Sequence, residues 1–371
     1  MPERLTYARG IYGEEEKQAV RRSLDSGWLS GGVETGEFEH EFARWWGVKH
    51  SLAVNSGSSA DLVALQALNL PRGSEVITNA GAAFPTTVSA MTYLGLEPVF
   101  VDVKGLTIDP DEIKKAIGPK TKAVMFAHTL GFMPDMTEVM DIVNNNGLKL
   151  VEDCCDSVGS RQLGRLSGTY GNIATVSFYP AHHMTTGEGG MVLTNDSNLY
   201  REAYAVRNWG ADCTCGLNGG CATRFSNPPF DHRYYYTRIG GNFQITEMQA
   251  AFGREQLKRL DGFIETRRRN YNILANELGQ SECGEISPFA YPLFSKNKLE
   301  DMAYLNNKGI DTRVMFGGNI VRHPAFKGVG RVVGDLPESD RILNEGYFVG
   351  VGPHLSPDNM LYIAKEIKCL R

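Results

Sequence analysis

Long apolar segments are missing from this chain of 371 residues. No window approaches about 18 uncharged apolar residues, which excludes a transmembrane helix. Residues 1–20 are polar and charged and lack the apolar stretch of a secretory signal, so we expect a cytoplasmic protein. Internal repeats and low-complexity tracts are absent as well.

The chain also has no excess of basic residues. Its 38 lysines and arginines are outnumbered by 43 aspartates and glutamates, so the formal net charge is −5. No basic cluster resembles a nucleic-acid-binding surface, and we expect neither a nucleic acid nor a membrane as partner. The residues that are present, 42% apolar and 22% charged, make the composition of an ordinary globular protein.

A chain of this length usually divides into two domains. We predict a large domain over residues 1–260, N-terminal segment included, and a smaller C-terminal α+β domain over residues 261–371. A helix is expected over residues 245–278, interrupted near Asp261 and Gly262. Residues 212–238 have no periodicity, and a loop of this length inside a compact domain is often functional.

Short apolar runs alternate with helix-like stretches in the first two-thirds of the chain. Strands are predicted for residues 51–55, 75–78, 97–103, 122–128, 148–152, 173–178 and 190–194. Helices are predicted for residues 59–68, 86–94, 110–117 and 136–145. This alternation predicts an α/β fold with a mostly parallel sheet between helices. Ligands of such sheets bind at the carboxyl ends of the strands, where Asn55, Thr78 and Asp153 fall.

Two short motifs at predicted strand ends have the chemistry of a cofactor site. The small residues of Asn55-Ser-Gly-Ser-Ser59 precede a helix, whose free N–H groups can bind a phosphate. Asp153 ends an apolar strand, where its carboxylate could pair with a protonated pyridine nitrogen. Each motif alone also fits a purely structural role: the first could be an ordinary helix cap, and Asp153 could cap the turn that follows its strand.

A third motif gives the first two a common interpretation. Ser177-Phe-Tyr-Pro-Ala-His-His-Met-Thr-Thr-Gly-Glu-Gly-Gly190 resembles the active-site sequence S-F-x-x-x-K-x-x-x-x-G-E/D-G-G of the DegT/DnrJ sugar aminotransferase family. These are fold-type-I pyridoxal phosphate (PLP) enzymes with the aspartate aminotransferase fold. The resemblance covers nearly the whole chain, through Gly240-Gly-Asn-Phe-Gln-Ile-Thr-Glu-Met-Gln-Ala-Ala251.

The resemblance implies a role for each matching residue. The loop at Ser58 and Ser59, with the Ser177 hydroxyl, is expected to hold the cofactor phosphate. Asp153 is expected to pair with the pyridine nitrogen, and Phe84 to stack on the ring.

Two further positions carry implied roles. Asn242 is expected to reach the phosphate in a neighbouring subunit, which implies a homodimer with shared active sites. Asp156 stands where the family has glutamine, and Asp156 and Tyr179 are expected to tune the cofactor O3′ or the leaving group.

One position departs from the family. His182 stands where the family has its Schiff-base lysine, and no lysine occurs between Lys149 and Lys258. Imidazole forms no stable internal Schiff base, so we expect a noncovalent cofactor in its amine form, pyridoxamine phosphate (PMP). Histidine can still transfer a proton near neutral pH, whereas His183 beside it is expected to be structural.

This substitution resembles the nucleotide-linked 4-keto-6-deoxyhexose 3-dehydrases, in particular those of CDP-4-dehydro-6-deoxyglucose. The resemblance implies a nucleotide-sugar substrate, with His182 as the base and loss of the C3 hydroxyl in 3,6-dideoxysugar biosynthesis. Such sugars most often enter the lipopolysaccharide O-antigen. The alternatives are a cluster-free dehydrase that regenerates PMP from glutamate, an ordinary PLP sugar aminotransferase, an inactive aminotransferase that has drifted to histidine, and a noncatalytic binding protein.

Cysteines supply a route for the two electrons that the deoxygenation requires. Cys213, Cys215 and Cys221 form a C-x-C-x₅-C pattern, and Cys155 lies 58 positions before Cys213 (213 − 155). Four thiolates can hold a 2Fe–2S cluster. The CDP-sugar 3-dehydrases have a similar cysteine pattern, although their last gap is longer. This resemblance implies that a flavin and iron–sulfur reductase donates electrons to the cluster. A zinc site or unconnected loop cysteines remain the alternatives.

The other cysteines have no expected chemistry. We predict that Cys154, Cys283 and Cys369 are buried or partly buried.

Overall fold

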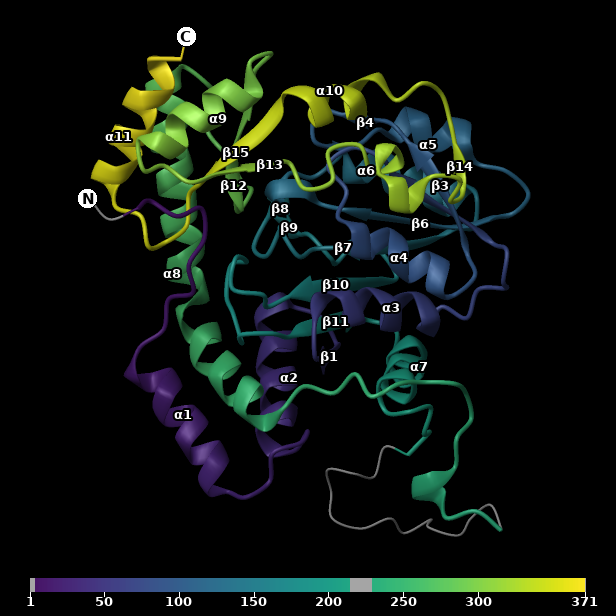
Figure 1. Ribbon diagram of the computed structural model, residues 1–371. Coiled ribbons are helices and arrows are strands. Elements are labelled where there is room, and N and C mark those ends of the chain that lie inside the picture. Colours follow the sequence, from purple (N-terminus) through teal and green to yellow (C-terminus); the bar gives the residue numbers. More distant parts are fainter. Residues whose placement is uncertain (1–3, 214–228, 371) are drawn as a thin grey trace.

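The computed structural model describes residues 4–213 and 229–370 (Figure 1). Its centre is an eight-stranded sheet in the order β1-β11-β10-β7-β6-β2-β3-β14. The strands are β1 (His50–Val54), β2 (Glu75–Asn79), β3 (Glu97–Val101), β6 (Thr121–Ala127), β7 (Lys149–Asp153), β10 (Ile173–Ser177), β11 (Gly190–Thr194) and β14 (Arg331–Val332). Within this sheet only β11 is antiparallel to its neighbours, so the other strands end at one common edge. The mostly parallel sheet is confirmed.

Helices cover both faces of the sheet (Figure 1). One face carries α3 (Gly57–Ala67), α4 (Pro85–Tyr93) and α7 (Ser197–Arg207). The other carries α2 (Val33–Trp46), α5 (Pro110–Ala116), α6 (Met136–Asn145) and the first half of α8 (Glu247–Leu278). Successive side chains of a strand point to opposite faces: in β6, Met125 packs toward α3 and α4, whereas Val124 and Phe126 pack toward α5 and α6. The predicted α/β fold is therefore confirmed.

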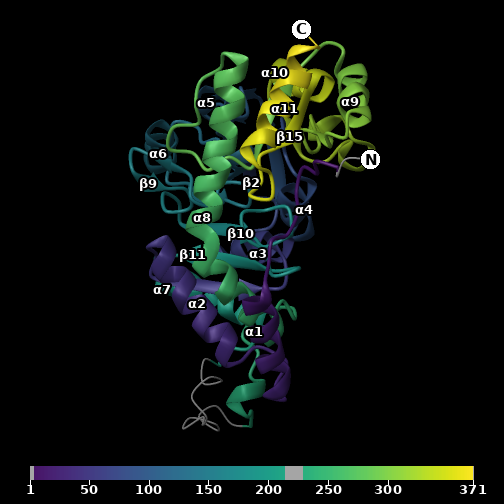
Figure 2. The ribbon, with the colours of Figure 1, turned by 90° about the vertical axis from the view of Figure 1, so that its left-hand side faces the viewer.

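Helix α8 is continuous, so the predicted interruption near Asp261 and Gly262 is wrong. Thr246 and Gln249 form a capping box at its start, and Gly279 ends it in the left-handed conformation. A glycine inside a helix costs about 1 kcal/mol, which the buried apolar face of α8 outweighs. Figure 2 shows α8 running from α1 (Glu14–Asp25) and α2 past the large sheet to the C-terminal elements.

The second half of α8 packs against a small antiparallel sheet. Its strands are β12 (Ala290–Phe294), β13 (Thr312–Val314) and β15 (Gly346–Gly350), and its helices are α9 (Lys298–Asn307), α10 (Pro337–Glu345) and α11 (Pro357–Lys368). The N-terminal segment joins this unit, because Leu5 pairs with Ile310 beside β13. The predicted division at residues 260 and 261 falls inside α8 and stays a prediction.

Short elements complete the described chain. Two hairpins consist of β4 (Val103–Lys104) with β5 (Thr107–Ile108), and of β8 (Arg161–Gln162) with β9 (Arg165–Leu166). Within the predicted loop of residues 212–238, the described part contains one 3₁₀ turn, His232–Tyr234. Cys215 and Cys221 lie outside the described residues. In the described part of the chain, no helix is both long and apolar enough to cross a membrane.

Candidate active site

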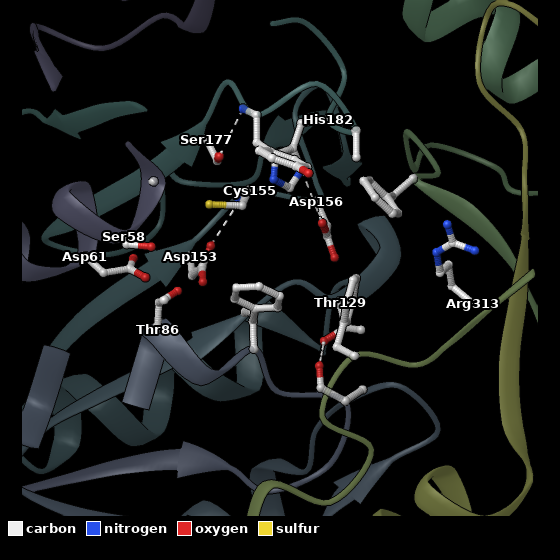
Figure 3. Close-up of a pocket in the computed structure, with 18 of the residues that line it drawn as sticks. Ser58, Asp61, Thr86, Thr129, Asp153, Cys155, Asp156, Ser177, His182 and Arg313 are labelled. Carbon is white, nitrogen blue, oxygen red and sulfur yellow. Dashed lines mark hydrogen bonds and ion pairs between the residues drawn. The ribbon is translucent and has the colours of Figure 1, made fainter. Parts of the chain in front are cut away.

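A cavity of about 560 Å³ lies where the carboxyl edge of the large sheet faces the small sheet. The sequence predictions that it brings together are Ser58, Phe84, Asp153, Cys155, Asp156, Ser177, Tyr179 and His182. Figure 3 labels all of these except Phe84 and Tyr179. Ser59, Asn242 and Cys213 are not among its lining residues. Chain order alone explains much of this grouping, because parallel strands deliver the residues that follow them to the same edge.

The loop that precedes α3 forms one end of the cavity. Ser56 caps the helix by accepting a 3.0 Å hydrogen bond from the Ser59 backbone N–H, and the two hydroxyls are also 3.0 Å apart. The Ser59 side chain therefore belongs to the cap, whereas Ser58 faces the cavity. Gly57 lies so close to Ser177 that a Cβ at position 57 would be 2.6 Å from the Ser177 Cβ. Only glycine permits this backbone approach.

Asp153 is held rigidly at the end of β7. One carboxylate oxygen accepts a 2.9 Å hydrogen bond from the Thr87 hydroxyl, and the other accepts a 3.1 Å bond from the Cys155 backbone N–H. The side chain is buried and still lines the cavity. The Phe84 ring, half-exposed before α4, lines the same space and meets the Phe316 ring edge-on at 5.9 Å.

A second carboxyl group stands beside Asp153. Asp61 is buried on α3, lines the cavity and accepts a 2.7 Å hydrogen bond from the Thr175 hydroxyl. Burial and the neighbouring Asp153 charge raise the pKa of Asp61 well above that of an ordinary carboxyl. Sequence reasoning missed this residue, although an aspartate between Ala60 and Val63 on an apolar helix was a usable signal.

His182 lies in the cavity next to Asp156 (Figure 3). Its Nδ1 is 3.5 Å from Asp156 Oδ1, which is longer than a hydrogen bond but close enough for a small rotation to close. Asp156 itself is fixed, because its other oxygen accepts a 3.1 Å bond from the Leu130 N–H. Phe289 faces the imidazole with ring centroids 5.5 Å apart. A proton on Nδ1 facing Asp156 leaves Nε2 as an acceptor.

Arg267 of α8 fixes the backbone around His182. Its guanidinium donates to the carbonyls of Phe289 at 2.8 Å, His182 at 3.0 Å and Ala181 at 3.3 Å. Burial lowers the pKa of Arg267 to about 10, so the group remains charged at neutral pH. His183 lies outside the cavity lining, and burial together with Arg267 lowers its pKa well below the usual value.

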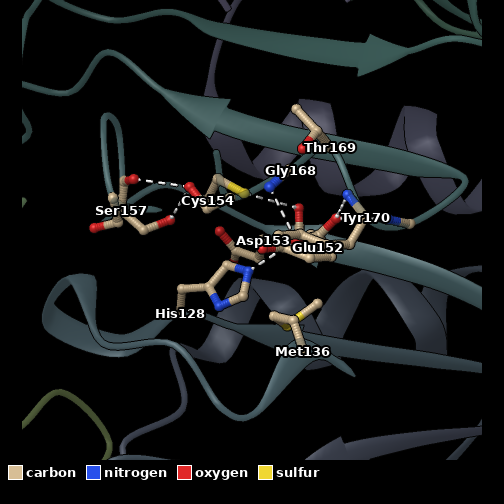
Figure 4. Close-up of polar contacts among 12 residues, drawn as sticks. His128, Met136, Glu152, Asp153, Cys154, Ser157, Gly168, Thr169 and Tyr170 are labelled. Atoms are coloured by element: carbon tan, nitrogen blue, oxygen red, sulfur yellow. Dashed lines mark hydrogen bonds and ion pairs between the residues drawn. The ribbon is translucent and has the colours of Figure 1, made fainter. Parts of the chain in front are cut away.

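A buried carboxylate, that of Glu152, stabilises the backbone around Asp153 (Figure 4). Glu152, which precedes Asp153 on β7, accepts hydrogen bonds from the backbone N–H groups of Gly168 at 2.9 Å, Tyr170 at 2.8 Å and Gly171 at 2.6 Å. His128 Nε2 is 3.0 Å from the same carboxylate. The His128 backbone N–H donates to the Asp153 carbonyl, so this network ties the loop after β9 to the strand that carries Asp153.

The cysteines divide between cavity, core and surface. Cys155 lines the cavity, and burial and the adjacent Asp153 raise the pKa of its thiol well above the usual value. Cys213 is partly buried. Cys154 and Cys283 are buried as predicted, but Cys369 is exposed, so that prediction is wrong. Cys369 caps the end of α11, beyond the turns that pack on α8.

Several lining residues had no signal in the sequence. They include Tyr7, Thr86, Thr129 and Phe289. Conversely, Asn55 and Thr78 follow or end strands but are not among the lining residues. The Thr78 side chain is buried under the edge, and Asn55 donates to the Asn242 carbonyl at 3.4 Å.

Known proteins with similar sequences and folds match nearly the whole chain. The model of the DegT/DnrJ/EryC1/StrS aminotransferase family matches residues 11–368. "Lipopolysaccharide biosynthesis protein RfbH" of Salmonella typhimurium is 40% identical, over 96% of this chain and 90% of that protein. The dTDP-4-dehydro-2,6-dideoxy-D-glucose 3-dehydratase of Saccharopolyspora spinosa is 38% identical, over 96% and 84%. A structure of E. coli GDP-4-keto-6-deoxy-D-mannose-3-dehydratase with bound hydrated PLP has a TM-score of 0.89 at 27% identity, and the match covers 98% of each chain.

Proposed function

Because the chain belongs to the DegT/DnrJ/EryC1/StrS aminotransferase family, we propose that it is a PMP-dependent nucleotide-sugar 3-dehydrase. Its substrate would be a nucleotide-linked 4-keto-6-deoxyhexose, CDP-linked, which loses its C3 hydroxyl in 3,6-dideoxysugar biosynthesis. One observation carries the proposal: His182, which stands at the family's lysine position by resemblance, lines the same cavity as Ser58, Asp153 and Ser177. Two relatives that are named as 3-dehydratases support the proposed reaction.

The residues around the cavity fit the cofactor. Gly57, Ser58 and Ser177 make a cradle that a larger residue at position 57 would fill. Asp153 offers the ring nitrogen a carboxylate held by two donors, and the half-exposed Phe84 ring can cover one ring face. When bound, PMP supplies an amine for the substrate ketone and a ring that accepts electrons.

His182 would act as the base and Asp156 as its partner. Nε2 accepts a proton while Nδ1–H points to Asp156, which fixes the tautomer and stabilises the charged imidazole. Arg267 holds the backbone carbonyl of His182, so the ring pivots on a fixed support. The same histidine can return its proton to the departing C3 hydroxyl.

An oxygen-isotope experiment tests this reaction. The protein is incubated anaerobically with PMP and CDP-4-keto-6-deoxyglucose in ¹⁸O-labelled water, with an enzyme-free control for exchange at the ketone. A second label, lost in His182→Asn and retained in the matched surface variant His40→Asn, is the expected result. Label at the ketone alone, with an aminosugar appearing once glutamate is added, would replace the proposal by transamination. No second label and no aminosugar with CDP-, dTDP- and GDP-linked substrates would favour a noncatalytic binding protein.

We further propose that Cys155, Cys213, Cys215 and Cys221 hold a 2Fe–2S cluster that relays electrons from a flavin and iron–sulfur reductase. Its support is the position of Cys155, which lines the cavity directly after the Asp153 strand. The test is anaerobic reconstitution with iron and sulfide, followed by iron analysis and visible absorption. Cys155→Ser is expected to lose the iron and the exposed Cys369→Ser to retain it. Iron bound equally by both variants, or zinc bound instead, would refute the cluster.

The same resemblance leads us to propose a homodimer in which Asn242 completes the neighbour's phosphate site. Asn242 is exposed and absent from the lining of its own cavity. Segments that contact residues 241–247 carry three exposed apolar side chains, Trp28, Trp209 and Ile239. These side chains offer apolar surface to which a second copy of the chain could bind.

Mixing two inactive variants tests shared active sites. Asn242→Ala and His182→Asn proteins, mixed and allowed to exchange subunits, are expected to recover activity, because one hybrid site keeps both residues. Sedimentation of a monomer, or no recovery from hybrids that have formed, would refute this arrangement.

A further inference from the structure

Negative charge outweighs positive charge along the cavity. Four acidic residues line it: Asp61, Asp153, Asp156 and Glu188. Among the described residues of the lining, Arg313 is the one arginine or lysine. A nucleotide sugar carries its own negative charge on a diphosphate, and like charges at close range oppose binding. An anionic substrate therefore has one permanent cation in the described lining to pair with.

Arg313 is oriented by its neighbours on the small sheet. It projects from β13, and its Nη1 donates to Asp311 Oδ1 at 2.6 Å and to the Thr312 carbonyl at 2.8 Å. Its guanidinium lies over the Tyr7 ring, 4.5 Å from the centroid. The Arg313 side chain also interacts with the Tyr7 hydroxyl, and it is 48% exposed. A half-exposed guanidinium fork that borders the cavity fits an oxyanion.

The supports of Arg313 are themselves fixed. Asp311 is buried at 5% exposure and also accepts a hydrogen bond from the Tyr7 backbone N–H at 3.3 Å. Tyr7 is held because Leu5 exchanges backbone hydrogen bonds with Gly309 and Asp311. The N-terminal segment thus brings an aromatic ring under the arginine, and a stacked guanidinium loses little freedom on binding.

The position of Arg313 matches one part of the substrate. Figure 3 shows Ser58 and Arg313 at opposite ends of the cavity, with His182 and Asp156 between them. A phosphate at the Ser58 end and a reacting C4 ketone near His182 leave the Arg313 end for the rest of the substrate. On a hexose, the diphosphate is attached at C1, across the ring from C4.

We infer that Arg313 binds the diphosphate of the nucleotide-sugar substrate, and that Asp311 and Tyr7 position its guanidinium. This inference rests on the proposed function and names the residue that recognises the anionic part of that substrate. A carboxylate, such as that of an amino donor, has similar oxyanion chemistry. The experiment therefore compares the two anions directly.

Binding is measured by calorimetry on the PMP-loaded protein, with CDP, dTDP, GDP and glutamate as probes. Arg313→Gln is expected to weaken the best-bound nucleoside diphosphate by roughly tenfold to a hundredfold, the effect of one charge-assisted contact. Arg313→Lys keeps the charge but not the fork and should lose less. Arg4→Gln is the matched control, because Arg4 also contacts Asp311, at 3.3 Å, but does not line the cavity. Its affinity should be unchanged.

The positioning residues have their own readout. Asp311→Asn and Tyr7→Leu should raise KM for the substrate several-fold and leave kcat at saturation within about twofold, which general damage to the fold would not do. Circular dichroism confirms that each variant is folded.

The outcomes separate this inference from the proposed reaction. Unchanged nucleoside diphosphate affinity in folded Arg313→Gln, or a loss of glutamate affinity alone, would overturn the inference. Because binding is measured without turnover, a failed isotope experiment with an intact Arg313 effect would refute the reaction and leave diphosphate binding standing.

Discussion

Glu152→Gln is expected to destabilise the protein strongly, although it changes one buried atom. The carboxylate accepts two hydrogen bonds on each oxygen: Tyr170 and Gly171 N–H on Oε1, and Gly168 N–H and His128 Nε2 on Oε2. A glutamine offers one oxygen and one NH₂ group. The less costly orientation places the NH₂ group at Oε2, where His128 can change tautomer and accept.

The size of the stability loss follows from the hydrogen bonds that the glutamine cannot accept in that orientation. The Gly168 N–H is left buried without an acceptor, which costs about 1–3 kcal/mol. The bonds from Tyr170 and Gly171 lose the charge of their acceptor, which weakens each by about 1 kcal/mol. Together these terms predict a loss of about 3–5 kcal/mol, a large share of the roughly 5–15 kcal/mol by which proteins are usually stable.

Urea unfolding of the cofactor-free protein at pH 7.5 measures this loss. The matched control is Glu138→Gln, because Glu138 pairs with Lys114 at the surface, with both side chains exposed, and should change the free energy of unfolding by less than about 1 kcal/mol. The reasoning is refuted if Glu152→Gln is as stable as the control. That result would mean that the Glu152 charge contributes nothing to the network.

Three further changes test other parts of the structure. Asp61→Asn should raise the free energy of unfolding of the cofactor-free protein at pH 7.5 but not at pH 3.5. Because the pKa of Asp61 is raised in the folded protein, this carboxyl ionises at a lower pH in the unfolded chain than in the folded one. The wild-type residue therefore favours folding only at low pH. Equal effects of the substitution at the two pH values would contradict this reasoning. Gly57→Ala should lower the affinity for PMP at least tenfold in an absorption titration, because its Cβ would meet Ser177, and unaltered affinity would disprove the close approach. Gly262→Ala should stabilise the protein by up to about 1 kcal/mol in urea, because no atom lies within 4 Å of the new Cβ on α8; destabilisation would show that the helix needs glycine there.

Tertiary packing decided several features that local patterns could not. Gly262 was expected to interrupt α8, but helix propensity is a weak preference and the buried face of a long helix overrides it. Ser59 matched the phosphate motif as well as Ser58 does. Only the structure shows that the Ser56 cap engages Ser59 and leaves Ser58 facing the cavity.

The sequence by itself determined the sheet, its helices and the cofactor end of the cavity. Apolar alternation specifies which face of each strand is buried, and parallel strands carry the residues after them to one edge. Asp153, Ser177 and His182 could therefore be grouped from their order along the chain. Tyr7 and the supporting Glu152 could not. They reach the site through the docking of the small sheet and N-terminal segment, or through a network beneath it, and such contacts between distant segments leave no periodic signal in the sequence.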